Sequence, residues 1–207
     1  ELAQNHDFRF IITNTTEAGI AFVVEDKYED RPAKSFPAKL TQLLYARYKA
    51  GLNGFVIFAC ELIDNNATQL QGFVLRYAQQ WKLGEDFSYW IIEENKFCNT
   101  LVDRIVTGYP KDDAEKFYDE IGYDDKLLDT AEPYHLWVIE GDYEKELPLQ
   151  KAGLNVIWTN DVKAYKKMKV RILNGSHTSL VFPSMLCGID TVKKSLEDKD
   201  LNAFLNT

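Results

Sequence analysis

The pattern of hydrophobic and polar positions begins with two continuous apolar runs that enclose a helical pattern. The runs cover residues 8–14 and 54–60 and are rich in aromatic and β-branched side chains, while leucines recur at helical spacing across residues 38–49. Continuous apolar runs of this length are typical of strands buried on both faces of a sheet. Two such strands joined by a helix form a βαβ unit, so the sequence predicts an α/β fold with a parallel sheet covered by helices.

Further helical and extended patterns follow, and the chain ends in helices. The sequence predicts helices over residues 67–80 and 86–95, a short and partly extended segment over 99–106, strands over 134–140 and 153–158, and helices from residue 161 onward. Asp64, Asn65 and Asn66 precede the helix at 67–80, and side chains of these types commonly cap helix starts. The acidic, tyrosine-rich segment 111–130 is interpreted as a surface insertion whose charge faces solvent.

Charge and composition argue against two classes of partner. The chain has a formal net charge of −8 and no run of five or more basic residues, which argues against a nucleic acid as the main partner. Its longest apolar runs are far too short to cross a bilayer, so no membrane partner is expected. Three widely spaced cysteines without a C-x-x-C pair favour a reducing cytoplasm as the location.

One helical run near the end of the chain carries three polar side chains on an apolar face. At about 100° per residue, His177 lies about 80° and Asn174 about 140° from Lys169, so an imidazole, a carboxamide and an amine share one sector. Four apolar side chains fall in the same sector: Val170, Leu173, Leu180 and Val181. This combination indicates the wall of a cleft that grips a polar ligand in a dry setting.

The three polar side chains supply the parts needed to move hydrogen between a secondary alcohol and a ketone. Desolvation lowers the pKa of an amine, so a buried lysine can accept a proton near neutral pH. An asparagine amide can donate to a carbonyl or alkoxide oxygen, and a histidine can donate or accept. This chemistry requires no metal. The alternative is a buried structural network, or an amphipathic helix whose lysine reaches out to water.

The 11 glycines of the chain are placed so that no two of them form a G-x-G pair. The sequence therefore contains neither a dinucleotide-binding fingerprint nor a P-loop. A nucleotide cofactor would have to receive its pyrophosphate site from sequence outside these 207 residues. The chain also begins at Glu1, without an initiator methionine and close to its first predicted strand, and is interpreted as a piece of a longer protein.

Several motifs resemble those of the mannitol dehydrogenase family, the polyol-specific long-chain dehydrogenases and reductases. The most specific are KVRILNGSHT, which contains Lys169, Asn174 and His177, and NTLVDRIV at residues 99–106. TNTTEAG and CELIDNN fall in the order in which that family would place them. EPYHLWVIEG, LPLQKAGLNVIWTND and RPAKSFPAKLTQLLYARY look most like the branch of the family that processes hexuronates. The resemblance runs through essentially the whole chain.

The resemblance implies a cytoplasmic NAD-dependent enzyme of hexuronate breakdown that interconverts D-altronate and D-tagaturonate, with a small sugar acid as substrate. It implies that residues 1–162 are the later half of a Rossmann-type domain and that residues 163–207 begin a mainly α-helical C-terminal domain. By the same resemblance Lys169 is the general acid/base and Asn174 holds the reacting oxygen as alkoxide character develops. His177 would orient the same oxygen or a neighbouring hydroxyl.

Two carboxylates are further candidates, for cofactor binding. Asp103, within NTLVDRIV, is expected near the nicotinamide or the catalytic lysine, and structural pairing with Arg104 is the equal alternative. Glu17 follows the first predicted strand, at the sheet edge where ligands of open α/β proteins bind. The alternative role for Glu17 is to cap a helix.

The sequence departs from the family pattern at two positions. Mannitol dehydrogenases tend to have Asp-Asn after the cysteine of the second motif, and this chain has Glu61 and Leu62. A second oxyanion donor is therefore missing, or it comes from Asn65 or Asn66. The family also tends to have a glutamate one helical turn before the lysine, where this chain has Lys166. Both departures favour a uronate-processing enzyme over a mannitol dehydrogenase, and an anionic substrate would suit the added positive charge of Lys166.

Other functions compete with this interpretation. One is a mannonate, arabinitol or mannitol dehydrogenase of the same family. Another is a non-catalytic fragment that only binds or assembles, since the chain lacks a phosphate-binding loop. A hydrolytic metal site made of Glu132, His135 and His177 is disfavoured, because no metal-ligand spacing links these residues. No metal is therefore expected at the site.

Overall fold

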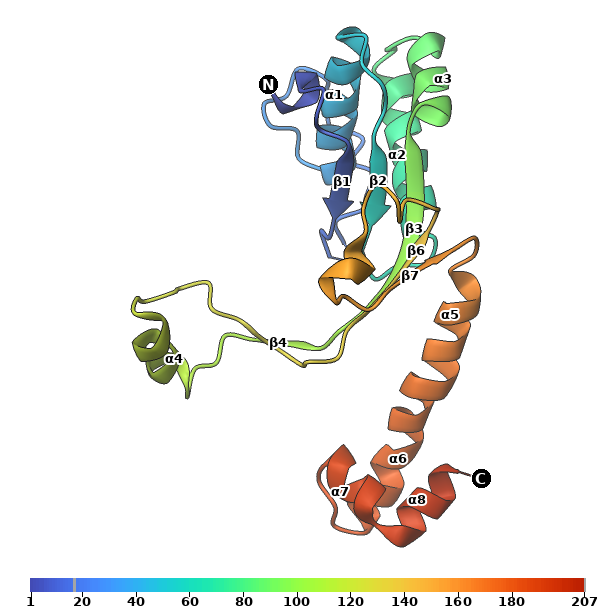
Figure 1. The fold of residues 1–207 in the computed structure, drawn as a ribbon. Coiled ribbons are helices and arrows are strands. Elements are labelled where there is room, and N and C mark those ends of the chain that lie inside the picture. The colour runs from blue at the N-terminus through green and yellow to red at the C-terminus, as the bar shows by residue number, and fades with distance from the viewer. Residues whose placement is uncertain (17, 207) are drawn as a thin grey trace. The chain divides into compact units, whose positions relative to one another are not determined.

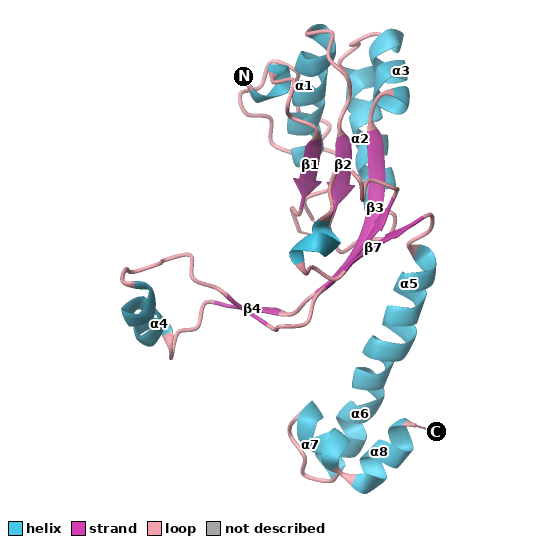
Figure 2. Ribbon diagram, viewed as in Figure 1, coloured by secondary structure: helices cyan, strands magenta, loops and turns pink. Residues whose placement is uncertain are grey.

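The computed structural model describes residues 1–16 and 18–206, which fall into two compact units. The first unit covers Glu1–Asn160 and the second covers Asp161–Thr207, and each is described by itself (Figure 1). Figure 2 shows that the strands belong to the first unit, whereas the second is built from helices. The domain boundary that the family resemblance implies, after residue 162, stays a prediction.

The first unit alternates strands and helices along most of its length. Its elements are, in order, η1 (Leu2–Gln4), β1 (Phe10–Thr13), α1 (Phe36–Lys49), β2 (Val56–Ala59), α2 (Asn66–Gln80), α3 (Glu85–Glu93), β3 (Lys96–Asp103), β4 (Val106–Gly108), α4 (Ala114–Ile121), β5 (Thr130–Ala131), β6 (Leu136–Glu140), η2 (Leu149–Ala152) and β7 (Val156–Thr159). The predicted βαβ unit is present, with α1 between β1 and β2. The segment predicted as short and partly extended at 99–106 is largely the second half of the long strand β3.

Five strands form one sheet in the order β1-β2-β3-β6-β7. β1, β2 and β3 are parallel, and β6 and β7 are parallel to each other, but β6 pairs antiparallel with β3. The parallel pairing expected from the sequence thus holds on each side of one antiparallel junction. β3 continues through residues 100–103, beyond the end of β2, and the chain re-enters the sheet from that same end. An antiparallel neighbour needs no crossover helix packed on the sheet, so β6 can pair directly with β3.

Two hydrophobic clusters cover the two faces of this sheet. Alternate residues of a strand point to opposite faces. Ile57 and Ala59 of β2 pack with residues of α1, α2 and α3, whereas Val56 and Phe58 pack with residues of β6, β7 and the segment 143–149. All the residues of β2 are buried, which explains why its sequence is apolar throughout.

Local signals set the start and the end of α1. The hydroxyl of Ser35 accepts a hydrogen bond from the backbone N–H of Ala38, and Pro37 lies in the first turn, where its missing N–H costs nothing. After the helix, Gly51 adopts a positive φ of 68°, a conformation that suits glycine. Leu40 and Leu44, on the face toward the sheet, are buried.

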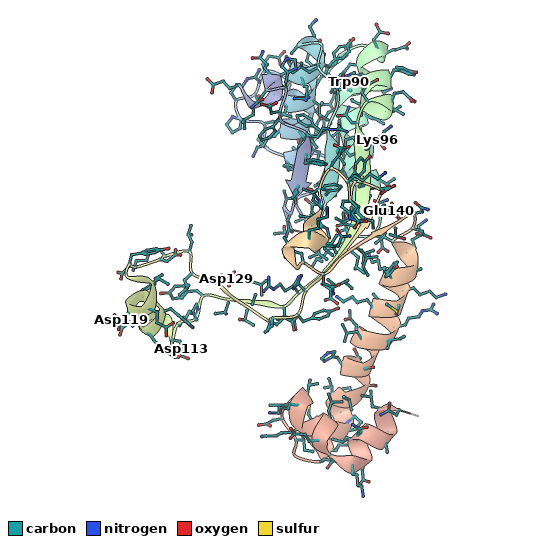
Figure 3. The ribbon with its side chains drawn as sticks, in the orientation of Figure 1. Trp90, Lys96, Asp113, Asp119, Asp129 and Glu140 are labelled. Carbon is teal, nitrogen blue, oxygen red and sulfur yellow. The ribbon has the colours of Figure 1, made fainter. Side chains whose placement is uncertain are left out.

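An acidic insertion lies between β3 and β6. β4 and β5 pair in a separate two-stranded sheet, and α4 connects them in the sequence. Figure 3 labels Asp113, Asp119 and Asp129, whose side chains lie on this insertion. Most residues of 111–130 are exposed, in agreement with the surface insertion that the sequence predicts.

The second unit contains α5 (Lys163–Met168), the π-helical turn η3 (Lys169–Asn174), α6 (Gly175–Leu186), α7 (Val192–Glu197) and α8 (Lys199–Leu205). α5, η3 and α6 follow one another without a break as one long helix (Figure 1). The hydroxyls of Ser184 and Ser195 are 2.8 Å apart and join α6 to α7. The helices of this unit agree with the helical pattern predicted from residue 161. Among the described residues, no helix has the length and apolar character needed to cross a bilayer.

Candidate functional site

The carboxyl ends of the parallel strands form one edge of the sheet. Thr13 of β1, Ala59 of β2 and Asn99 of β3 lie in register across that edge. Ligands of open α/β sheets bind outside the carboxyl ends of the strands. The side chains that follow these positions are therefore the first unit's candidate ligand-binding groups.

Glu61, just after β2, is the most buried charged group at this edge, with 2% of its surface exposed. One carboxylate oxygen accepts the hydroxyl of Thr13 at 3.0 Å. The other accepts both the backbone N–H of Thr15 at 3.1 Å and its hydroxyl at 3.0 Å. Glu61 thus fastens the segment after β1 to the end of β2. Sequence reasoning treated Glu61 as a departure from a family pattern and missed this contact, which links residues 46 positions or more apart.

Asn66, at the start of α2, joins the end of β2 to β3. Its Nδ2 donates to the carbonyl oxygens of Glu61 and Thr100, and its Oδ1 accepts the backbone N–H groups of Ala67 and Thr100. The residue is 1% exposed. Both amide hydrogens are therefore already used inside the protein.

This arrangement corrects one expectation from the sequence. Asn66 is not available as an oxyanion donor, because its amide is buried and bonded to main-chain oxygens. Asn65, the other candidate, is exposed and has a left-handed backbone with φ of 50°. Of the two, Asn65 alone retains an accessible amide.

The two predicted cofactor residues belong to the first unit's sequence. Asp103 ends β3 and is buried, opposite Leu136 of β6. Burial raises the pKa of Tyr134, and the nearby carboxylates of Asp103 and Glu132 raise it further. Glu17 lies outside the described residues, so its predicted role stays a prediction.

In the second unit, the predicted catalytic residues lie on and beside the π-helical turn. The backbone N–H of Gly175 donates to the carbonyl of Val170, five residues earlier. A π turn contains one residue more than an α turn, and such turns are frequent at functional sites. Because of the extra residue, Asn174 lies closer to the face of Lys169 than the α-helical angle of about 140° would place it. His177 follows in the first turn of α6.

Burial differs among these three side chains. Lys169 is half-buried, whereas Asn174 and His177 are exposed. The apolar residues predicted to share their face are also uneven, since Leu180 is buried while Val170 and Leu173 are exposed. Residues 161–206 therefore bring the three groups onto one helix but leave much of that face uncovered.

His177 also lines a cavity of about 270 Å³ between α6 and α7. The lining includes the apolar side chains of Leu180 and Val192, the buried hydroxyls of Ser184 and Ser195, and Asp190. The imidazole thus lies at the border between the exposed helix face and a small partly polar hollow.

The metal alternative receives no geometric support within residues 1–16 and 18–206, where no three His, Cys, Asp or Glu side chains are grouped so that they could hold a metal ion. The Nε2 of His135 accepts the backbone N–H of Asn155 at 2.9 Å. One oxygen of Glu132 accepts the N–H of Ile105 at 2.7 Å. Both side chains therefore accept hydrogen bonds from main-chain groups of other segments of the chain.

The donor set at the carboxyl edge suits part of a dinucleotide. The exposed amide of Asn65 matches the neutral hydroxyls of a ribose and the carboxamide of a nicotinamide. The hydroxyl of Thr15 already donates to Glu61, and the amide of Asn99 already donates to Thr68 and Glu140. Gly19 lies so close to Thr15 that a Cβ there would overlap the threonine side chain and carbonyl, so the main chain is tightly folded at this edge. An accessible neutral amide at this edge fits the uncharged half of NAD, whereas the pyrophosphate needs a glycine-rich loop of another segment.

Comparison with protein families gives two matches that together cover most of the chain. The mannitol dehydrogenase Rossmann domain matches residues 1–153, and the mannitol dehydrogenase C-terminal domain matches residues 161–207. Altronate oxidoreductase of Enterobacter sp. (strain 638) is 50% identical over 99% of the chain, and that of Escherichia coli O7:K1 (strain IAI39 / ExPEC) is 49% identical over the same share. The chain spans 44% of the length of each of these relatives.

Two solved structures have the same fold over nearly the whole chain. D-sorbitol dehydrogenase in its substrate-free form is 28% identical, with a TM-score of 0.82 over 98% of this chain and 44% of that protein. Pseudomonas fluorescens mannitol 2-dehydrogenase, in a ternary complex with NAD and D-mannitol, is 23% identical, with a TM-score of 0.67 over 99% of this chain and 44% of that protein. These likenesses confirm the predicted Rossmann-type fold followed by a helical domain.

Proposed function

The chain belongs to the mannitol dehydrogenase family, and on this basis we propose that it is part of an NAD-dependent oxidoreductase that interconverts D-altronate and D-tagaturonate. The observation that carries the proposal is the 49–50% identity to altronate oxidoreductases over 99% of the chain. Those relatives are more than twice as long. In this proposal, as the family resemblance implies, residues 1–162 are the later half of the NAD-binding domain and residues 163–207 begin the helical substrate domain. The enzyme is then a tagaturonate reductase.

Lys169 is the general acid/base of this proposal. In oxidation its neutral amine accepts the proton of the reacting hydroxyl, while the hydrogen on the same carbon leaves with its electron pair as hydride. In reduction the ammonium returns a proton to the new alkoxide. NAD, when bound, supplies the hydride acceptor. A neutral amine requires a dry surrounding, and Lys169 is already half-buried on the π turn. Other parts of the enzyme are expected to cover the rest of this face.

Asn174 and His177 hold the reacting oxygen. The carboxamide of Asn174 donates to it and stabilises the negative charge that develops as the alkoxide forms. The imidazole of His177 orients the same oxygen or a neighbouring hydroxyl of the sugar acid. The π turn supports this assignment, because it brings Asn174 toward the face of Lys169.

Cofactor binding is assigned to the carboxyl edge of the sheet. Glu17, in the segment after β1, and Asp103, at the end of β3, are the proposed contacts to the nicotinamide side of NAD. The phosphates are bound by a glycine-rich loop that these 207 residues do not contain. The substrate is a small sugar acid, the protein acts in the cytoplasm, and neither a nucleic acid nor a membrane is a partner.

Turnover by the intact enzyme tests the proposal. NADH oxidation is followed by absorbance with D-tagaturonate, and NAD reduction is followed with D-altronate, D-mannonate, D-arabinitol and D-mannitol. The proposal expects the highest kcat/KM for the altronate and tagaturonate pair. Preferred turnover of mannitol or another polyol would replace it with one of the other activities of the family.

The same proposal predicts that residues 1–207 alone have negligible dehydrogenase activity, because the phosphate loop is missing from the sequence. The isolated chain is mixed with NADH and D-tagaturonate, and the absorbance of NADH is followed. Steady oxidation of NADH by this chain would contradict the proposed division of the cofactor site.

A further inference from the structure

The turn that follows β1 has an unfavourable backbone conformation. Thr16 has a φ of 70°, in the left-handed region that a β-branched residue rarely adopts. The backbone N–H of Gly19 donates to the carbonyl of Thr16 at 3.2 Å and closes the turn. Backbone strain of this kind persists only where surrounding contacts hold it, and it is concentrated at functional sites.

Glu61 supplies contacts that hold this turn. Its carboxylate receives hydrogen bonds from the Thr13 hydroxyl and from both the N–H and the hydroxyl of Thr15. These donors immediately precede Thr16, and they fix the direction in which the chain leaves β1. Gly19 also lies close to Thr15, and any Cβ at position 19 would overlap the side chain and the carbonyl of Thr15. Thr15 is therefore in contact with both a buried carboxylate and the main chain of the same turn.

We propose that Glu61 is a positioning residue that keeps residues 13–16 in their NAD-binding conformation. This inference rests on the proposed function, because it takes the carboxyl edge of β1 as part of the NAD site. Glu61 does not itself touch the cofactor in this proposal, since it is 2% exposed and both of its oxygens face Thr13 and Thr15. It acts through the turn that it fixes.

Two substitutions of Glu61 distinguish a positioning role from a direct role of its negative charge. The carbonyl oxygen of a glutamine at position 61 can accept both bonds from Thr15, and its amide can donate to the hydroxyl of Thr13. Glu61→Gln therefore keeps the turn in place while it removes the charge. Glu61→Ala removes all three acceptor contacts and releases the turn.

The test is NADH binding and turnover by the intact enzyme, with four variants beside the wild type. Glu61→Ala is compared with Glu61→Gln, and the same two substitutions at Glu93 are the controls. Glu93 is an exposed residue at the end of α3, near the opposite end of the sheet. NADH dissociation constants are measured by fluorescence without substrate, and KM and kcat are measured with D-tagaturonate.

We expect Glu61→Ala to raise both the dissociation constant and the KM for NADH about tenfold, with kcat at saturating NADH within about threefold of wild type. Glu61→Gln and both Glu93 variants should stay within about threefold of wild type in all three quantities. An unchanged affinity for NADH in Glu61→Ala would overturn the proposal. An equal loss of kcat in Glu61→Ala and Glu61→Gln would also overturn it, because the charge itself would then act in the reaction.

A milder variant covers the case in which Glu61→Ala does not fold. Thr15→Val removes the hydroxyl donor but keeps the backbone N–H, and it should weaken NADH binding about threefold at unchanged kcat. Unchanged NADH binding in Thr15→Val would then count against the proposal. A wild-type enzyme that binds NADH normally but does not reduce D-tagaturonate would contradict only the proposed substrate. The comparison of NADH affinities would then still test the role of Glu61. Absent NADH binding by the wild type would overturn the proposed function and this inference with it.

Discussion

The side chain of Asn66 pairs with the main chain of Thr100 in the way that a neighbouring strand would. Its Nδ2 donates to the carbonyl oxygen of Thr100 and its Oδ1 accepts the N–H of the same residue, both at 3.1 Å. Thr100 is the first residue of β3 beyond the end of β2. The amide of Asn66 therefore replaces the strand that is missing there, and it fixes the carboxyl edge from which NTLVDRIV continues.

Replacing Asn66 should destabilise the fold strongly. Asn66→Asp loses both amide donors and places a buried carboxylate beside the carbonyl oxygens of Glu61 and Thr100. Leaving buried polar groups unsatisfied in this way should lower the free energy of unfolding by about 3 kcal/mol. Urea unfolding measures the change. Asn65→Asp is the matched control, since Asn65 is exposed and aspartate also tolerates its left-handed backbone. Equal stability of the two variants would contradict this role of Asn66.

A lysine in place of Arg47 of α1 should lower the free energy of unfolding. The residue is 3% exposed, and its guanidinium carbon lies 4.1 Å from the ring centre of Phe55. It donates to the main-chain oxygens of Ala3, Asn5, Phe8 and Asn53. A lysine offers three donors from one point and cannot reproduce this fork, so Arg47→Lys should cost about 2 kcal/mol of unfolding free energy.

A second arginine provides the comparison for Arg47. Arg76 is exposed, and its guanidinium lies 3.7 Å from the ring centre of Phe22. Lysine keeps the charge over that ring, so Arg76→Lys should change the urea midpoint little. A midpoint shift for Arg47→Lys no larger than that of Arg76→Lys would refute the structural role of the buried fork.

Asp26 should make stability depend on pH in the acid range. Burial alone would raise the pKa of Asp26, but hydrogen bonds from Ser35, Lys34 and Tyr77 outweigh it and hold this pKa below its ordinary value. A carboxyl with a lowered folded-state pKa contributes stability above its unfolded pKa of about 3.9 and loses it as the pH falls through the folded value. Asp26→Asn should therefore destabilise the protein near neutral pH and much less in acid.

Unfolding free energies at several pH values check this dependence. The difference between wild type and Asp26→Asn should be about 2 kcal/mol near neutral pH and shrink steadily below about pH 4. Asp119→Asn, at an exposed position of α4, is the control and should show no such trend. A difference for Asp26→Asn that stays constant down to acid pH would show that the lowered pKa makes no contribution.

The strands of the sheet were predictable because strands buried on both faces consist of apolar residues. β2 is buried on both faces, and the apolar run at 54–60 that predicted a strand contains all of it. Strand direction leaves no such mark, since β6 shows the same alternation whether it runs parallel or antiparallel to β3. The antiparallel junction depends on how residues 104–135 return to the sheet, and the hydrophobic pattern does not record that path.

The polar contacts were less predictable because they join distant parts of the chain. The sequence offered Asp64, Asn65 and Asn66 as caps of the helix, and the N-cap residue is Asn65. The sequence did not reveal that the side chain of Asn66 bonds to Thr100, 34 positions away. The motif around Lys169 was recognisable, but its π turn was not, because the angles assumed an α-helix throughout. The dryness of that helix face also depends on surfaces that its own periodicity cannot reveal.

The most direct test of the account concerns Lys169 as the proton acceptor and donor. The decisive quantity is kcat for D-tagaturonate reduction near neutral pH, measured for the wild type, for Lys169→Ala and for Lys193→Ala, an exposed lysine of α7. General acid/base catalysis contributes about 10²–10⁴-fold, so Lys169→Ala should lower kcat by that factor while NADH affinity stays nearly intact. Lys193→Ala should retain normal turnover. A near-normal kcat in Lys169→Ala would remove this lysine from the mechanism and contradict the account.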